Sequence, residues 1–294
     1  MNERDTELTA VSSATGPALP ELSDSEEAAV RASIRARRHR RRVVQWGLGI
    51  ASVVLVVGIY DAVTHLPGSN PAIVPPLHAI GDKAVSLIAD GSLPSAAGAS
   101  LETVAIGYVI GCGLGILIGS LRGWFRIIGY LLDPIIDSLR PVPALAYIPL
   151  VILWVGIGEN ARVLVISVAS FLSCVVSVSA GMREVPIVYV EAARTMGARR
   201  ARVFWTIAIP ASVPYIFAGL RVALGAAWGT LVAAELIAAQ NGLGFLLETG
   251  QEFLQTAQVM TSLVTIGVLG FLMDVLLRVL QRRVARWAPE DTGR

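Results

Sequence analysis

The residue pattern with the clearest potential for function is a charged loop between two long apolar stretches. Its alanines and glycine would keep it narrow enough to enter a cleft. Its carboxylates lack the histidine, cysteine or lysine neighbours that catalysis needs. It is therefore interpreted as a docking loop, although an ordinary short helical loop rich in arginine would show the same pattern. The residues concerned are Glu191, Ala192, Ala193, Gly197 and Ala198, followed by Ile207-Ala208-Ile209-Pro210.

Some ionisable residues lie inside apolar stretches, where charge is costly and is usually functional. Arg221 lies eleven residues after Pro210, and Asp274 lies eight residues before Arg282. At about 1.5 Å per helical residue the two reach similar depth, so they are predicted to form a buried ion pair. A structural role for this pair is favoured over a functional one, because buried charges need mutual neutralisation. Glu235 has no obvious partner in the sequence and is a candidate for lining a translocation path. Asp133 and Asp137, one turn apart in a proline-rich stretch, are close enough to Arg140 for local pairing.

Small residues form two rows at helical spacing. Glycine at every fourth position makes a smooth ridge against which another helix can pack closely. Serines in a later stretch could line an aqueous path, but they could equally pack helices and bond back to their own carbonyls. The glycines are Gly107, Gly111, Gly115 and Gly119, and the path candidates are Ser170, Ser173 and Ser177.

No nucleotide, metal or catalytic site is predicted. A phosphate-binding loop needs Gly-Lys-Ser or Gly-Lys-Thr, whereas the only lysine is Lys83, between aspartate and alanine. The three histidines are scattered, and Cys112 and Cys174 lie in apolar stretches without the spacing of zinc ligands. The chain is therefore expected to bind no cofactor, and any ATP and Mg²⁺ would be held by a partner ATPase.

Composition predicts an all-α membrane protein. The chain is 54% hydrophobic and 16% charged, whereas soluble domains carry about a quarter charged residues. Six stretches are long enough for transmembrane helices. They are residues 43–63, 101–121, 127–155, 161–182, 211–237 and 259–280. The third contains four prolines, so it could be one kinked span or a broken one.

Arginine placement predicts the orientation. Lys83 and Arg162 are the only basic residues in the proposed outer loops, and cytoplasmic loops attract basic residues, so both termini are predicted to be cytoplasmic. The predicted order is a disordered leader at 1–42, acidic and then basic, a first span at 43–63 and an extracytoplasmic segment at 64–100 with an amphipathic helix near 77–88. A core at 101–285 contains the docking loop at 183–210, and a cytoplasmic tail follows at 286–294. The basic run of the leader is interpreted as a topology signal, not as a nucleic-acid site.

Within the docking loop, two short helices are predicted. Pro186 suits the first position of a helix, and Gly197 suits the left-handed conformation that ends one. A second helix over 198–208 is predicted to stop at Pro210 and Pro214.

These residues resemble a known family. Glu191-Ala192-Ala193, then Gly197, then Ile207-x-Ile209-Pro210 resembles the EAA loop of permease subunits of binding-protein-dependent ABC importers, with isoleucine in place of the usual leucine before the proline. Further motifs are similar to the nitrate, sulfonate and taurine branch, and the resemblance covers about residues 70–287. These motifs are Arg140-Pro141-x-Pro143-x-x-Ala146-x-x-Pro149-Leu150, Leu153-Trp154-x-Gly156-x-Gly158-Glu159, Glu235-Leu236, Gly242-Leu243-Gly244, and Gly267-x-x-Gly270-x-x-x-Asp274 with Trp287.

The resemblance implies a methionine-importer-like permease fold, that of type I ABC importers, in a homodimer within the plasma or inner membrane. Each loop would sit in a groove of one of two cytoplasmic ATPase subunits, and an extracytoplasmic binding protein would deliver the substrate, a small anion or organic solute such as a sulfonate, taurine or nitrate. Glu191 and Gly197 would couple to the ATPase, with Ala192, Ala193 and Ala198 shaping the contact.

Two other classes of function are weighed against this one. An ion-coupled secondary transporter could use Glu235, or Arg221 with Asp274, as an ion relay. It would usually show internal repeats, which this sequence does not clearly show, and it would leave the EAA loop unexplained. A membrane-embedded enzyme is disfavoured because no spaced catalytic residues are found.

Overall fold

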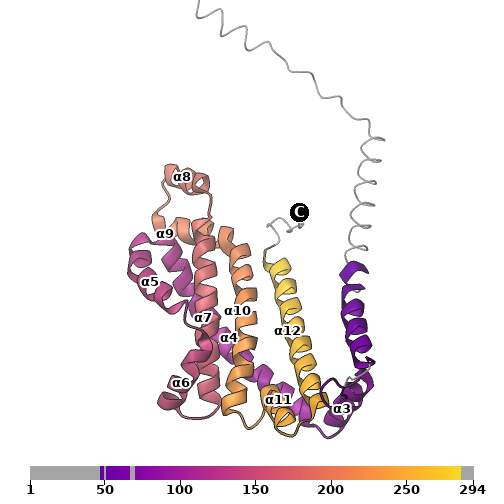
Figure 1. The fold of residues 1–294 in the computed structure, drawn as a ribbon. Helices are drawn as coiled ribbons and strands as arrows, with labels where there is room; N and C mark the ends of the chain where they lie inside the picture. The colour runs from indigo at the N-terminus through magenta and orange to yellow at the C-terminus, as the bar shows by residue number, and fades with distance from the viewer. Residues whose placement is uncertain (1–46, 50, 67–69, 286–294) are drawn as a thin grey trace, which may run out of the picture. The chain divides into compact units, whose positions relative to one another are not determined.

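The computed structural model describes residues 47–49, 51–66 and 70–285 (Figure 1). The predicted leader at 1–42 and the tail at 286–294 lie outside these ranges. The chain divides near residue 67 into two units, which are described separately. In the first unit, a helix over Gly47–Thr64 is long and apolar enough to cross a membrane, close to the span predicted at 43–63.

Every regular element of the second unit, within the described ranges, is helical. The elements are α3 Leu77–Ala89, α4 Ser92–Trp124, α5 Arg126–Leu139, η1 Ala144–Tyr147, α6 Ile148–Val155, α7 Glu159–Arg183, α8 Ile187–Thr195, α9 Arg200–Val203, η2 Phe204–Ala208, α10 Ile209–Ala238, α11 Leu243–Glu252 and α12 Thr256–Val284. The described ranges hold five helices able to span a membrane, or six with one bent pair. The all-α prediction is confirmed.

The third predicted span is broken. The helix α5 and the segment Ala144–Val155 meet at an angle of 86°. Pro141 and Pro143 lie at the break, where proline disfavours helical backbone in the residue before it. Figure 1 places α5 near the end of the bundle that carries α8 and α9, and α6 at the opposite end. Of the two forms that the sequence left open, the single kinked helix is not formed.

The helix α4 begins well before the span predicted at 101–121. Its first residue is Ser92, and Gly91 before it has a φ of 79°. The Asp90 carboxylate accepts hydrogen bonds from the Ser92 hydroxyl at 2.5 Å and the Ser92 backbone N–H at 2.9 Å, which hold the pKa of Asp90 below its ordinary value. Leu93 is buried in a cluster with Leu87 of α3 and Leu243. The predicted core boundary at residue 101 therefore falls inside a helix, and α3 packs with the core.

The glycine ridge of α4 packs against α7. A methyl group on Gly107 would lie 2.8 Å from Ile166 Cβ, and one on Gly115 would lie 2.7 Å from Cys174 Cβ. Gly111 and Gly119 face the same helix, and the row extends one turn further to Gly123. Such approaches are possible only without side chains, so the ridge holds the centre of the bundle together.

The second helix of the docking loop does not end at Pro210. The backbone stays helical from Arg200 to Ile237, a single candidate span. The turn before Pro210 is a π-helix over Phe204–Ala208. Proline lacks an N–H and clashes with the carbonyl four residues earlier, and a widened turn is one of the ways in which a helix relieves that conflict. The predicted stop at Pro210 and Pro214 is therefore wrong.

Candidate coupling loop and buried polar network

The elbow, defined here as residues 186–208, is built around a helix with a complete glycine cap. The helix α8 follows Pro186 and ends at Thr195. Gly197 has a φ of 81°, the left-handed conformation that was predicted. The N–H of Gly197 donates to the Arg194 carbonyl at 2.8 Å, and the N–H of Ala198 donates to the Ala193 carbonyl at 3.0 Å. These two bonds form a Schellman motif, which fixes the direction in which the chain leaves α8.

The five predicted coupling residues face two ways. Ala193 is buried in a cluster with Val190 and Val203, and Ala198 packs against that cluster. Glu191, Ala192 and Gly197 are exposed. Two of the alanines therefore hold the elbow together, while the other three residues are open to a partner.

Several large apolar side chains of the elbow are exposed. Met196 is 81% exposed, and Tyr189 and Trp205 are also largely exposed. A groove of about 450 Å³ lies between α8 and the start of α10, lined in part by Tyr189, Met196 and Pro210. Contiguous exposed apolar surface of this kind marks interaction sites. The elbow therefore combines a fixed backbone with a surface suited to another protein.

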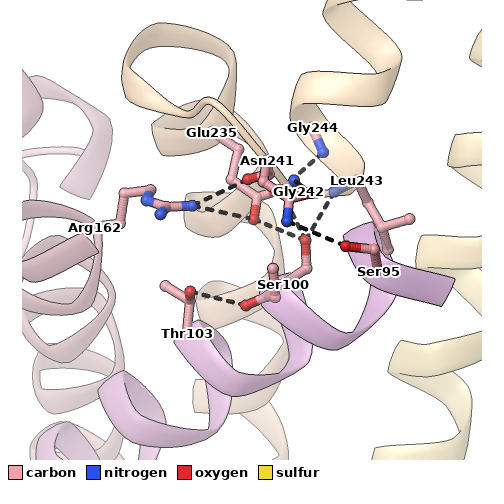
Figure 2. Close-up of polar contacts among 10 residues, drawn as sticks. Ser95, Ser100, Thr103, Arg162, Glu235, Asn241, Gly242, Leu243 and Gly244 are labelled. Atoms are coloured by element: carbon pink, nitrogen blue, oxygen red, sulfur yellow. Dashed lines mark hydrogen bonds and ion pairs between the residues drawn. The ribbon is translucent and has the colours of Figure 1, made fainter. Parts of the chain in front are cut away.

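A second polar site surrounds Glu235 near the far end of α10 (Figure 2). Its carboxylate is fully buried. It accepts hydrogen bonds from the Ser100 hydroxyl and the Gly244 backbone N–H, each at 2.7 Å. Arg162 Nη1 lies 3.7 Å from the carboxylate, and the Leu243 N–H donates to Ser100 Oγ at 2.8 Å. The interpretation that Glu235 lacks a partner is wrong, because α4, α7 and the start of α11 all contribute one.

Glycines make room for this carboxylate. A Cβ on Gly244 would lie 2.6 Å from Glu235 Cβ, and one on Gly242 would overlap the carboxylate itself. Gly242 also has a φ of 133°, which is favourable only for glycine. In the sequence, the pattern Gly242-x-Gly244 was the one sign of this network around Glu235. No spacing rule connects that pattern with Ser100 or Arg162.

The candidate path serines lie in helix contacts, away from Glu235. Ser170 is fully buried and meets the ridge at Gly111. Ser177 lies against Gly219 of α10, and its hydroxyl donates to the Ser173 carbonyl at 3.0 Å. Within one chain these residues do not share an open space with Glu235, which is itself buried. Packing is the role that their contacts support.

Arg221 and Asp274 lie in contact, although they are not buried. Arg221 Nε donates to Asp274 Oδ1 at 2.7 Å. Their side chains are 42% and 23% exposed, so the description of a buried pair is wrong for the single chain. Arg278, one turn after Asp274, donates its Nε to Oδ2 at 2.8 Å. This third member follows the four-residue spacing of helical ion pairs and was missed.

A further ion cluster joins α4, α5 and α7. Arg122 is only 7% exposed, and it lies 2.5 Å from Asp133 and 3.2 Å from Asp137. Arg183 lies 3.5 Å from Asp133. The sequence suggested that Arg140 would pair with these aspartates, but the structure gives them to Arg122 and Arg183 instead.

Comparison with known proteins decides the family. Residues 111–286 match the family described as binding-protein-dependent transport system inner membrane component. The chain belongs to this family. It is therefore a multi-pass membrane permease. In the described ranges no three histidine, cysteine, aspartate or glutamate side chains gather as metal ligands would.

Relatives of this permease place it in the nitrate, sulfonate and taurine branch. It is 42% identical over 82% of its length to a probable ABC transporter permease protein of Brucella melitensis, 98% of which is covered. It is 36% identical over 87% of its length to the taurine transport system permease protein TauC of Escherichia coli, with 98% of that protein covered. It is 32% identical over 63% of its length to the nitrate import permease protein NrtB of Synechococcus elongatus, with 68% covered.

The fold of the permease resembles that of a methionine ABC transporter, MetNI, in an inward-facing conformation. The TM-score is 0.56 at 19% sequence identity, over 65% of this chain and 95% of the other. At this identity the likeness concerns the fold alone. The predicted methionine-importer-like fold is confirmed.

Proposed function

We propose that this permease imports a small anion or organic solute such as taurine, another sulfonate or nitrate. Two copies form the path, two cytoplasmic ATPase subunits supply the energy, and an extracytoplasmic binding protein delivers the substrate. The substrates named for the taurine and nitrate relatives support the substrate class. ATP and Mg²⁺ are bound by the ATPase subunits and not by this chain. The permease stands in the inner membrane with both termini in the cytoplasm, as arginine placement indicates.

The observation that carries this proposal is the exposed apolar surface of the elbow. Tyr189 and Met196 are exposed and line a groove, while the backbone beside them is fixed by the cap at Gly197. A partner that fills the groove covers this surface and meets Glu191 at its edge. Arginines of the same segment support a cytoplasmic position for the elbow, the side on which the ATPase would lie.

The helix that leaves the elbow supplies a route for coupling. It continues without a break from Arg200 to Ile237 and carries Glu235 next to α11. A rigid element with two arrangements can carry a nucleotide-dependent signal between its ends. Closure of the ATPase pair would swing the elbow, tilt α10 against the glycine-packed pair α4 and α7, and shift α11. The path is proposed to run between the two copies.

A pair of matched glycine variants tests the coupling. Gly197 and Gly91 have φ angles of 81° and 79°, and neither has an atom within 4 Å of an added Cβ. Valine at either position imposes a left-handed strain of roughly 1–2 kcal/mol, but only Gly197 lies in the elbow. We expect Gly197→Val to lower taurine uptake and co-purification of the ATPase about tenfold, and Gly91→Val to preserve both. Equal behaviour of the two variants would remove the elbow from the coupling mechanism.

A further inference from the structure

The cluster of Arg221, Asp274 and Arg278 has an excess of positive charge. Two guanidinium groups share one carboxylate, so the cluster has a formal charge of +1 when all three are ionised. Both oxygens of Asp274 are used, since Oδ1 accepts from Arg221 and Oδ2 accepts from Arg278. Asp274 therefore contacts both arginines, but its single negative charge neutralises only one of them.

Arg221 keeps most of its donors free. Only its Nε is engaged with Asp274, and its two terminal nitrogens make no hydrogen bond to any residue in the described ranges. The side chain is 42% exposed. Two of its neighbours one turn away on α10 are small, namely Ala218, which is exposed, and Gly225, where an added Cβ would meet nothing within 4 Å. These two residues leave the terminal nitrogens of Arg221 uncovered on this side of α10.

The cluster lies at depth in the candidate spans. Arg221 is twelve residues into α10 from Ile209, and Asp274 is ten residues from the end of α12 at Val284. Arg221 is thus near the middle of the continuous helix Arg200–Ile237, a candidate span, and Asp274 is inside the candidate span Thr256–Val284. The two helices run side by side in Figure 1. An uncompensated cation at such depth is costly, so an anion is favoured beside it.

We propose that Arg221 is an oxyanion-binding residue, with its two terminal nitrogens forming a bidentate site for a sulfonate, nitrate or phosphate group. The planar guanidinium matches such groups in geometry. Asp274 orients the side chain through Nε and keeps the net charge low, so that an anion can bind and also leave, as transport requires. The assignment of this ligand to a transported anion rests on the proposed function. A phospholipid headgroup offers the same chemistry.

Two double variants with the same formal charge test the site. Arg221→Gln with Asp274→Asn leaves Arg278 alone, and Arg278→Gln with Asp274→Asn leaves Arg221 alone, so each retains +1. The measurement is the thermal unfolding midpoint of the purified full transporter in nanodiscs, with methanesulfonate as the probe. Dimethyl sulfone, which has a similar shape and no charge, is the control compound.

We expect methanesulfonate to raise the midpoint of the wild type, and by a smaller amount that of the variant that keeps Arg221 but has lost its orienting partner Asp274. Dimethyl sulfone should have no effect. The variant without Arg221 should show no rise, and its taurine uptake should fall about tenfold or more, because both hydrogen bonds of the bidentate contact are lost. If Arg221 and Asp274 only stabilised the fold as an ion pair, removing both charges together would leave no unpaired charge. The Arg221→Gln, Asp274→Asn variant would then keep its taurine uptake. Retained uptake, or an equal methanesulfonate effect in both variants, would overturn the proposal.

Native mass spectrometry separates the two sources of the anion. A tightly held phospholipid that is lost from the Arg221→Gln, Asp274→Asn variant, with no methanesulfonate effect in the wild type, would uphold the oxyanion site but remove it from the substrate path. The proposed function fails on other grounds, namely if the wild-type transporter lacks an ATPase or imports neither taurine, nitrate nor an alkanesulfonate. The effect of methanesulfonate on the unfolding midpoint can be measured whether or not the proposed function holds. Failure of the oxyanion site and failure of the proposed function are therefore distinguishable.

Discussion

The carboxylate of Glu235 accepts a hydrogen bond from the backbone N–H of Gly244 at 2.7 Å, which joins the far end of α10 to the first turn of α11. A backbone donor at a helix start and a carboxylate suit each other, because the first N–H groups of a helix lack partners within the helix. The contact is closed off from solvent, since the Glu235 side chain is fully buried. It therefore fixes α11 to the same helix that leaves the elbow.

Replacing this carboxylate should loosen the site. In Glu235→Gln the amide nitrogen would face donors from Ser100, Gly244 or Arg162, and a buried donor without an acceptor costs about 1–3 kcal/mol. We expect a lower unfolding midpoint for the purified transporter. We also expect faster proteolysis near α11, measured by limited digestion and mass spectrometry.

The control for this variant is on α11 itself. Glu252 is exposed, so Glu252→Gln should change the free energy of unfolding by no more than about 0.5 kcal/mol. A midpoint for Glu235→Gln equal to that of Glu252→Gln would show that the buried network does not stabilise the fold.

The glycine ridge permits a second comparison within a single helix. A Cβ on Gly115 would lie 2.7 Å from Cys174 Cβ, whereas one on Gly113 would meet nothing within 4 Å. Gly115→Ala should force α4 and α7 apart at a cost of about 1–3 kcal/mol. Gly113→Ala should be neutral or stabilise by up to about 1 kcal/mol, since alanine is the better helix former. Unfolding midpoints measure both, and a loss at Gly113 as large as that at Gly115 would contradict the packing argument.

Much of the fold follows from local sequence. The apolar stretches at 161–182, 211–237 and 259–280 became α7, α10 and α12, and the amphipathic pattern near 77–88 became α3. Gly197 took the left-handed conformation because no other residue does so at low cost. Hydropathy and backbone preference act over a few residues, so one sequence suffices to read them. The start of α4 at Ser92 was missed because its first two turns include polar and small residues that gain burial only against α3 and α11.

The polar contacts could not be obtained in the same way. Glu235 finds Ser100 across 135 positions, a contact that depends on how α4 and α10 meet. Asp133 and Asp137 were assigned to Arg140 by helical spacing, yet they bind Arg122, eleven and fifteen residues away. The contact between Arg221 and Asp274 could be predicted, because the position of a residue along each span can be counted from the sequence. Side chains in a bundle are paired by helix rotation and tilt, which hydropathy does not specify.

The Arg122 cluster should show graded sensitivity. Arg122→Gln leaves Asp133 without its nearest cation, and we expect a loss of about 1–3 kcal/mol because Arg122 itself is 7% exposed. Asp137→Asn removes only the longer contact of a carboxylate that is 61% exposed, so its cost should stay below about 1 kcal/mol. Chemical or thermal unfolding of the purified transporter ranks the two, and the reverse order would mean that burial of Arg122 does not govern its contribution.

The elbow surface gives a prediction that separates docking from folding. Met196 is 81% exposed and Leu153, on α6 at the other end of the bundle, is 80% exposed. Truncation to alanine should leave the stability of the free permease within about 0.5 kcal/mol of the wild type in both cases, since about four fifths of each side chain is exposed. In the full transporter the two should differ. Met196→Ala should weaken retention of the ATPase about tenfold, a cost within the range found for residues at the centre of an interface, whereas Leu153→Ala should retain it. The measurement is the amount of ATPase that still co-purifies with the permease after several detergent washes. If Met196→Ala retained as much ATPase as Leu153→Ala, the exposed apolar surface of the elbow would not be where the ATPase binds.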